Sequence, residues 1–189
     1  MQPTADVSVR TAWTADAAAI AAVQVDAWRE SYVSLLPAEV LAGLDADPIA
    51  DRWAASLAKP GDARNRVLVG LERATVRGFA VTGPSGDPDA DPVADGEIAE
   101  LVVEPARRGS GHGSRLLQAC ADTLRADGFR RATIWLASSD DRARAFLTAA
   151  GWAPDGAHRE LDLRGDAEIV VKQVRLHTDL GADQAAAIA

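Results

Sequence analysis

Apolar residues recur along the chain in alternating runs and in runs with a helical period, in an order that predicts a mixed α/β fold. Residues 7–12 alternate apolar and polar positions, as a first strand does, and the apolar positions of 20–32 follow a helical spacing. Proline suits the first turn of a helix, so we expect two further short helices, beginning near Pro37 and Pro48. The amino-terminal third is therefore one strand followed by three helices.

Two pairs of runs predict antiparallel hairpins. Residues 67–71 and 76–82 are rich in β-branched side chains and are separated by a short polar turn. Near the carboxyl end, 158–163 and 168–176 alternate around Arg164-Gly165-Asp166. By its alternation, His158 is expected at the surface.

A polar loop separates the first hairpin from the next strand. Residues 83–96 hold three prolines, three glycines and several aspartates, a composition that cannot form a core. We expect a flexible loop there. It is either a solvated connection, which we favour, or an acidic rim that captures a cationic acceptor.

The stretch 97–124 organises the rest of the chain, because it reads as an apolar strand, a glycine-rich turn and an amphipathic helix. The turn is Arg107-Arg108-Gly109-Ser110-Gly111-His112-Gly113-Ser114. Alternate glycines remove side chains where backbone N–H groups crowd inward, and a helix that starts there adds unpaired N–H groups and a positive dipole end. The turn is therefore predicted to bind an anion.

Spacing separates three phosphate-binding patterns. A Walker A loop needs a lysine, which this turn lacks, and the dinucleotide fingerprint would place its third glycine on a serine or a leucine. The pattern Arg/Gln-x-x-Gly-x-Gly/Ala does fit, with Arg108, Gly111 and Gly113 after the strand 98–103 and Pro105. This turn resembles motif A of the GCN5-related N-acetyltransferase (GNAT) superfamily, which cradles the pyrophosphate of acetyl-CoA.

The chain after the turn agrees with this resemblance. Because a strand–helix–strand order needs a crossover, the strand 131–137 should be parallel to the strand that begins at Glu97. The expected helix 140–150 resembles motif B of the family, usually Asn-x-x-Ala-x-x-Phe-Tyr-x-x-x-Gly-Phe. The matching positions are Ala143, Phe146, Gly151 and Trp152. Asp140 replaces the common asparagine, and Leu147 replaces the common tyrosine.

The resemblance implies a GNAT-like fold, a cofactor and a reaction. The fold is α/β, with a mixed, mostly antiparallel sheet of about seven strands flanked by helices, whose fourth and fifth strands are parallel and splay apart. Acetyl-CoA is the implied co-substrate, and its acetyl group passes directly to a primary amine in a ternary complex. The implied cofactor-binding residues are Leu101, Val102, Val103, Arg107, Arg108, Gly109, Ser110, Gly111, His112, Gly113, Ser114, Asp140, Arg142 and Phe146.

The reaction needs a base, since an amine with a pKa of roughly 10 is protonated at neutral pH. Glu97 falls where the histone-acetylating branch of the family often carries its base, and Glu100 is the second candidate. Because the common tyrosine is missing, the resemblance does not identify the acid that protonates the departing CoA thiolate. The hydroxyl groups best placed to replace it are those of Tyr32, Ser138 and Ser139.

The segment 28–37 is similar to the W-x-x-x-Y…L-P region of small-molecule members of the family, where the first two helices form a wall of the acceptor pocket. We nevertheless expect Trp28 and Trp53 to be core anchors before they are ligand contacts. Cys120 falls on the apolar face of the helix after the turn, so we expect a small core residue and not a nucleophile.

Composition narrows the remaining choices. With 189 residues, we expect one domain over 1–180 and a flexible tail over 181–189. A net charge of −8 argues against nucleic acid and favours a cationic partner, or merely keeps the protein soluble. One cysteine and three scattered histidines give no metal site. Without a membrane segment or a leader, a cytoplasmic protein is expected, and a homodimer is compatible with the sequence.

Two other functions stay open at this point. A non-catalytic acyl-CoA-binding module would explain the missing tyrosine at Leu147. A nucleotide-binding protein could use the same glycine turn. The sequence does not name the acceptor, which can be an antibiotic, a polyamine, an amino acid or a protein N-terminus.

Overall fold

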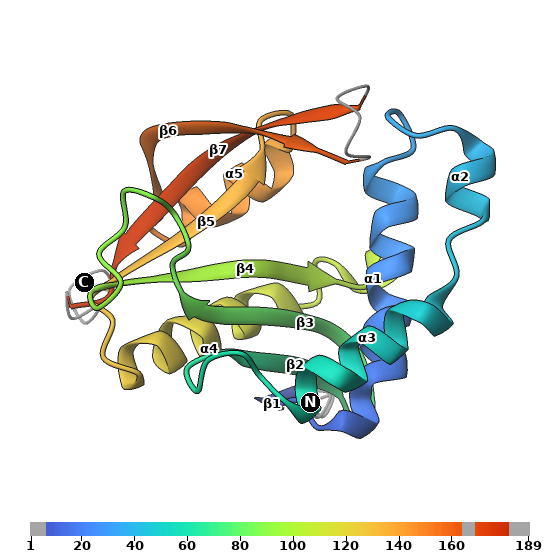
Figure 1. Cartoon of the computed structure of the whole chain (residues 1–189), viewed down its shortest axis with the longest axis horizontal. Helices are drawn as coiled ribbons and strands as arrows, with labels where there is room; N and C mark the ends of the chain where they lie inside the picture. The colour runs from blue at the N-terminus through green and yellow to red at the C-terminus, as the bar shows by residue number, and fades with distance from the viewer. Residues whose placement is uncertain (1–6, 164–168, 182–189) are drawn as a thin grey trace, which may run out of the picture. The chain divides into compact units, whose positions relative to one another are not determined.

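A computed structural model describes residues 7–163 and 169–181, whose strands form one sheet in the order β1-β2-β3-β4-β5-β7-β6 (Figure 1). The strands are β1 (Val7–Thr11), β2 (Arg66–Glu72), β3 (Thr75–Pro84), β4 (Asp95–Val103), β5 (Arg131–Ala137), β6 (Ala153–Asp162) and β7 (Val170–Asp179). The helices are α1 (Ala17–Ser31), α2 (Ala38–Ala42), α3 (Ala46–Ala58), α4 (His112–Ala126) and α5 (Asp141–Ala149), with 3-10 turns η1 (Thr14–Asp16) and η2 (Pro105–Arg107).

The sheet confirms the expected fold class. β4 and β5 are parallel, in a register that runs from Asp95↔Arg131 to Ile98↔Ile134. The pairs β1–β2, β2–β3, β5–β7 and β6–β7 are antiparallel, so both predicted hairpins are present. The turn of the second hairpin and the tail 182–189 lie outside the described residues.

The chain divides into two compact units. The first is Met1–Thr82 with Glu100–Cys120, and the second is Gly83–Ala99 with Ala121–Ala189. β4 and α4 each contribute residues to both units. The expectation of one domain over 1–180 stays a prediction.

The core of the first unit lies between its helices and β1–β3. Ile20 and Val23 of α1 pack with Val69 and Phe79, while Trp53 of α3 meets the Phe79 ring edge-on, with centroids 5.3 Å apart. Trp28 packs on a second cluster with Ala21, Val25 and Ile49. Both tryptophans are therefore core anchors, as expected.

The other face of these strands receives α4. Because neighbouring strand residues point to opposite faces, Gly78 faces away from Phe79. A Cβ at Gly78 would lie 2.6 Å from the carbonyl oxygen of Val102 and 3.0 Å from Leu116. The missing side chain therefore lets β4 and α4 approach β3 closely. Cys120 on α4 is fully buried, and burial raises the pKa of its thiol to about 12, which confirms a core residue and not a nucleophile.

We expect Gly78→Ala to destabilise the protein, because the new methyl group would overlap the backbone oxygen of Val102. Overpacking of this kind costs about 1–3 kcal/mol. The melting temperature should then fall by roughly 2–10 °C. Gly61→Ala is the matched control, since no atom lies within 4 Å of a Cβ at Gly61. Equal melting temperatures for the two variants would contradict the close approach.

Candidate active site

The glycine turn before α4 is built to present backbone N–H groups. Gly109 and Gly111 have φ angles of 79° and 84°, in the left-handed region that favours glycine. The N–H of Arg115 bonds the carbonyl of Gly111 at 3.2 Å. Among the described residues, the N–H groups from Gly109 to Ser114 have no hydrogen-bond acceptor. Consecutive unpaired N–H groups at a helix start are the donors that a phosphate needs.

Arginine side chains surround this turn in the first unit. Arg108 forms an ion pair with Glu30 of α1, and Arg107 lies 3.6 Å from Glu72. The Nη1 atom of Arg115 would lie 2.5 Å from a Cβ at Gly111, so that glycine lets the Arg115 guanidinium fold back over the turn. Free N–H donors and three guanidinium groups fit the pyrophosphate of acetyl-CoA.

His112 has a different role from its neighbours in the turn. Its side chain is only 2% exposed, and its Nδ1 atom has no hydrogen-bond partner among the described residues. Burial lowers the pKa of this imidazole, so the ring is neutral near pH 7. A charged ring is therefore not available to the cofactor, and the predicted contact through the backbone N–H of His112 stays a prediction.

Glu100 belongs to a hydrogen-bonded chain in the first unit. The Nε2 atom of Gln24 donates to both carboxylate oxygens of Glu100, at 3.1 and 3.2 Å, and the indole N–H of Trp53 donates to the Oε1 atom of Gln24 at 2.9 Å. Burial raises the pKa of Glu100, and the bond from Gln24 opposes that rise. The pKa of the half-buried Tyr32 is also raised, mainly by burial and to a smaller extent by the negative charge of Glu100.

Glu97, the favoured base, lies in the second unit. The backbone N–H of Gly86 lies 3.5 Å from its Oε2 atom, a long hydrogen bond. Burial raises the pKa of Glu97, and the negative charge of Asp87 adds to that effect, whereas the Gly86 N–H and Arg159 oppose it. Glu97 is thus a partly desolvated carboxylate with a raised proton affinity.

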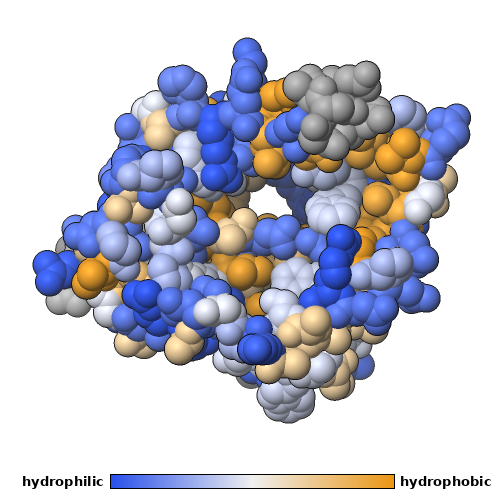
Figure 2. Space-filling model, in the orientation of Figure 1, coloured by the Kyte–Doolittle hydropathy of each residue, from blue (hydrophilic) through white to orange (hydrophobic). Residues whose placement is uncertain are grey.

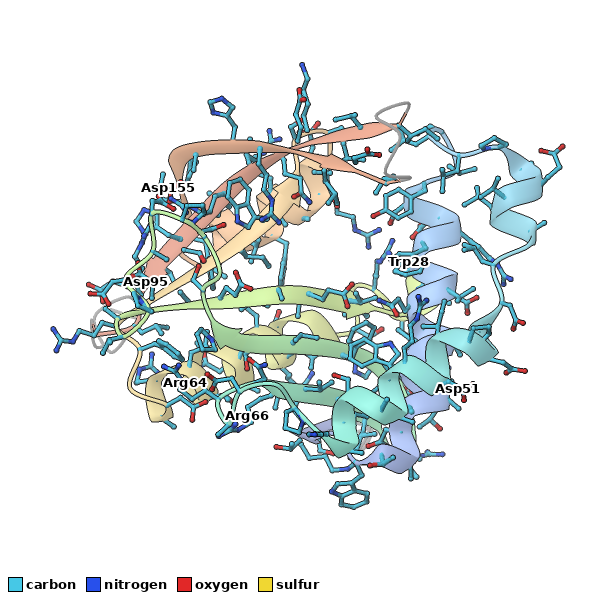
Figure 3. The ribbon with its side chains drawn as sticks, in the orientation of Figure 1. Trp28, Asp51, Arg64, Arg66, Asp95 and Asp155 are labelled. Atoms are coloured by element: carbon cyan, nitrogen blue, oxygen red, sulfur yellow. The ribbon has the colours of Figure 1, made fainter. Side chains whose placement is uncertain are left out.

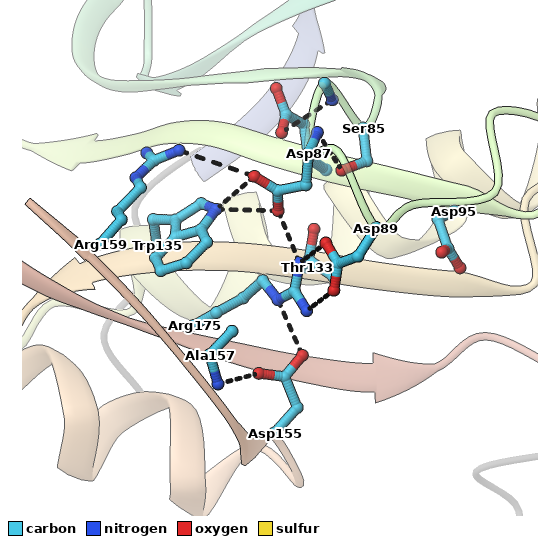
Figure 4. Close-up of polar contacts among 12 residues, drawn as sticks. Ser85, Asp87, Asp89, Asp95, Thr133, Trp135, Asp155, Ala157, Arg159 and Arg175 are labelled. Atoms are coloured by element: carbon cyan, nitrogen blue, oxygen red, sulfur yellow. Dashed lines mark hydrogen bonds and ion pairs between the residues drawn. The ribbon is translucent and has the colours of Figure 1, made fainter.

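The loop 85–94 is anchored, in contrast to the flexible connection that its composition predicts. Arg175 of β7 binds Asp87 at 2.9 Å and Asp89 at 2.6 Å (Figure 4). The indole N–H of Trp135 also donates to Asp87, at 3.0 and 3.1 Å. These two acidic side chains are therefore bound within the chain, which weakens the case for an acidic rim that captures a cation.

The same network extends to the strands of the second unit. Arg175 also binds Asp155 at 2.8 Å, and Arg131 joins Asp155 (2.6 Å) with Asp95 (3.6 Å), the two acids labelled at the left of Figure 3. The Arg159 guanidinium stacks on Trp135, 4.3 Å from the ring centroid. The loop, β5, β6 and β7 are thus linked by alternating charges.

The remaining predicted residues lie on β4 and around α5. Leu101, Val102 and Val103 are half-buried residues of the first unit. Asp140 caps α5, because its Oδ1 atom accepts the N–H of Ala143 at 2.9 Å. Ser139 and Arg142 are exposed, Phe146 is half-buried, and Leu147 is 1% exposed. The roles of all these residues in binding or catalysis stay predictions.

An apolar surface covers the segment after α1 and the helix α2. Val33, Leu35 and Val40 are exposed by 70%, 41% and 49%, and orange side chains gather over this segment in Figure 2. It follows Tyr32 directly along the chain. This position agrees with the acceptor-pocket wall that the family resemblance implies, a role that stays a prediction.

Sequence reasoning missed Arg115, Gln24 and Arg175. Arg115 follows Gly111 by one helical turn, a spacing that could have placed it over the glycine turn. Gln24 and Arg175 gave no signal, since their partners lie 76 and 86–88 residues away in the chain.

Comparison with known proteins gives the family. A profile of the acetyltransferase (GNAT) family matches residues 25–152. The uncharacterized N-acetyltransferase YuaI of Bacillus subtilis is 30% identical over 135 residues, which are 69% of this chain and 71% of that protein. A mycothiol acetyltransferase of Kineococcus radiotolerans is 34% identical over 94 residues, 50% of this chain but only 29% of that protein.

Solved structures share the fold. The putative acetyltransferase yncA of Salmonella typhimurium, determined with its cofactor acetyl-CoA, has a TM-score of 0.66 at 19% identity, over 95% of this chain and 96% of that one. The PaiA N-acetyltransferase of Thermoplasma acidophilum, in complex with coenzyme A, also has a TM-score of 0.66, at 12% identity over 92% and 99%.

The chain therefore belongs to the acetyltransferase (GNAT) family. It is an acetyl-CoA-dependent N-acetyltransferase, and acetyl-CoA is its co-substrate. The expected family is confirmed, and the protein is an enzyme, unlike the two non-catalytic alternatives. In the part of the chain that the structure describes, no group of histidine, cysteine or acidic residues could hold a metal ion, and no helix could cross a membrane.

Asp89 predicts a pH dependence of stability. Its hydrogen bonds to Arg175 lower the pKa of Asp89 to about 2 in the folded state. A lowered carboxyl pKa stabilises the protein above the unfolded value of 3.8, and this contribution is lost as the pH falls through about 2. Asp89→Asn should therefore melt below wild type at pH 6, and the difference should shrink between about pH 4 and 2.

The control is Asp51→Asn, which removes the same charge from α3, where Asp51 is exposed and has no described polar partner. Its melting temperature should follow that of the wild type at every pH. If the melting temperatures of Asp89→Asn and wild type differ by the same amount from pH 6 to pH 2, the pKa of Asp89 is not lowered by Arg175.

Proposed function

We propose that this enzyme transfers the acetyl group of acetyl-CoA to a primary amine of a small cationic molecule, by direct attack in a ternary complex. The unpaired N–H groups of residues 109–114, in a chain of this family, carry the proposal. Arg107, Arg108 and Arg115 would hold the pyrophosphate beside those groups. The backbone of 101–103 would pair with the pantetheine arm, as the family resemblance implies.

Glu97 is the proposed base. An amine with a pKa of about 10 at pH 7 faces a deficit of about three units, or about 4 kcal/mol, before its lone pair can attack. A carboxylate with a raised pKa is a better proton acceptor near neutral pH than an ordinary one. Glu97 meets this condition, because burial raises its pKa.

Tyr32 is the proposed donor to the departing thiolate. Leu147 has no proton to give, and its side chain is buried. The raised pKa of Tyr32 keeps its hydroxyl protonated, whereas Ser139 is exposed to water. A thiol pKa near 8.5 makes the thiolate a tolerable leaving group, so the acid should matter less than the base.

The charges of the acidic residues bear on the class of acceptor. Arg175 binds Asp87 and Asp89, so the loop 85–94 gives less support to a cationic acceptor than its composition does. Glu97 and Glu100 remain, since neither forms an ion pair with a described basic side chain. The fold does not choose between acceptors, because structures named as a putative phosphinothricin N-acetyltransferase and a ribosomal-protein-alanine N-acetyltransferase have similar TM-scores of 0.68 and 0.67. A cytoplasmic location and a homodimer stay proposals.

We expect acetyl-CoA to stabilise the protein. At about a hundredfold excess over its dissociation constant, a ligand adds about 2.7 kcal/mol, which raises the melting temperature by roughly 5–10 °C. Gly111→Asp should abolish this shift, because it strains the left-handed turn and adds a negative charge beside the phosphates. Gly61→Asp adds the same charge outside the turn, where no atom lies within 4 Å of a Cβ, and should keep the shift. An unchanged shift in Gly111→Asp would remove the turn from the cofactor site.

Glu97→Gln should lower turnover by roughly ten- to a thousandfold, as the loss of a general base does. Raising the pH should partly rescue the variant, because the amine then deprotonates without help. Release of free thiol with a panel of amines measures both effects. Tyr32→Phe and Ser139→Ala should each lower turnover by less than Glu97→Gln does. If Glu97→Gln is near wild type while Tyr32→Phe is severely impaired, the acid step limits the enzyme and this assignment is wrong.

A further inference from the structure

Glu100 differs from the other half-buried carboxylates of the first unit. Ion pairs with arginine hold the others, and also the buried Asp16: Asp62 with Arg64 at 3.1 Å, Glu72 with Arg77 at 3.1 Å, Glu104 with Arg77 at 2.9 Å and Asp16 with Arg10 at 2.7 Å. Glu100 has no described basic side chain within 4.0 Å, and its only described hydrogen-bond partner is the neutral amide of Gln24. Its charge is therefore uncompensated within the described residues.

The orientation of Gln24 follows from the chemistry of its neighbours. An indole N–H can only donate, so the amide oxygen of Gln24 must face Trp53. The amide nitrogen then faces Glu100, where it reaches both carboxylate oxygens. Gln24 is 5% exposed, so water does not replace these bonds readily. A buried amide and an indole thus align a carboxylate that no arginine neutralises.

The free energy of this arrangement favours a bound cation. Partial burial penalises the ionised carboxylate, and the amide donor recovers only part of that penalty. A positive charge within about 4 Å would recover more. Glu100 is accessible to such a ligand, because its side chain is only half-buried. It also directly precedes 101–103, the strand segment proposed to bind the acetyl donor.

We propose that Glu100, aligned by Gln24 and Trp53, binds the protonated amine of the acceptor. This subsite rests on the proposed function, and it gives Glu100 a role separate from that of Glu97. Glu100 holds the ammonium group of the acceptor and is not the base. Primary ammonium compounds are the class of ligand that the subsite accepts, and neutral isosteres are disfavoured.

Binding can be tested without turnover. The enzyme is saturated with CoA, which carries no acetyl group, and its glutamate side chains are isotopically labelled for NMR. The Glu100 carboxyl resonance is identified by its absence in Glu100→Gln. Methylammonium chloride should shift this resonance saturably and lower the apparent pKa of Glu100 more than sodium chloride of equal ionic strength. An identical response to both salts, or a response confined to Glu97, would overturn the proposal.

Two variants separate the alignment of Glu100 by Gln24 from a general effect of negative charge. Gln24→Ala leaves Glu100 in place but removes its donor, so the affinity for methylammonium should fall about three- to tenfold, the scale of one hydrogen bond. Glu39→Gln removes a charge from the exposed surface of α2 and should change nothing. Wild-type affinity in Gln24→Ala would overturn the alignment by Gln24.

Kinetics with the best amine of the panel give a second readout. Glu100→Gln should raise the KM of the amine by roughly ten- to a hundredfold, as the loss of a charged hydrogen bond does, with a smaller change in kcat. A fall in kcat at unchanged KM would make Glu100 the base and overturn the subsite. Thermal stabilisation by acetyl-CoA is measured on the same Glu100→Gln sample. Its persistence keeps the failure of this subsite distinct from a failure of the proposed function.

Discussion

Unpaired backbone N–H groups at the start of α4 are the feature on which the rest of the site depends. Such groups are costly to leave without partners, and a helix start cannot satisfy them internally. Left-handed glycines at positions 109 and 111 aim them outward, and Arg115 folds back over the gap that Gly111 leaves. These donors are available to an anion, and the pyrophosphate of acetyl-CoA is the anion that we propose for them.

Charge compensation divides the acidic residues into two groups. Most half-buried carboxylates of the described residues are paired with arginine, and the three carboxylates that Arg175 binds link the loop 85–94 to the strands of the second unit. Glu97 and Glu100 are left with neutral N–H donors and raised pKa values. Ionised but uncompensated carboxylates are destabilising by themselves, so their presence is more readily explained by proton transfer and by a cationic ligand.

Local patterns predicted most of the fold, and long-range contacts explain what they did not predict. Hairpins, helix starts and the crossover to β5 follow from neighbouring residues, and the glycine turn was recognisable because its function requires fixed spacing. The anchoring of the loop 85–94 was not predictable from its composition, because the arginine that binds Asp87 and Asp89 lies on β7. Likewise, nothing near Gln24 in the sequence indicates that Trp53 and Glu100 will orient it. A half-buried carboxylate is interpretable only when its partners are known.

The central claim is that the turn from Gly109 to Ser114 binds the pyrophosphate of acetyl-CoA. The most direct test is to titrate CoA into the protein and to follow its backbone amide resonances by two-dimensional NMR. The largest shifts should fall on the N–H groups of 109–114, which have no described acceptor in the free protein. Pantetheine, which lacks the pyrophosphate of CoA, should leave those resonances in place. Large shifts elsewhere, with the turn unmoved by CoA, would contradict the claim.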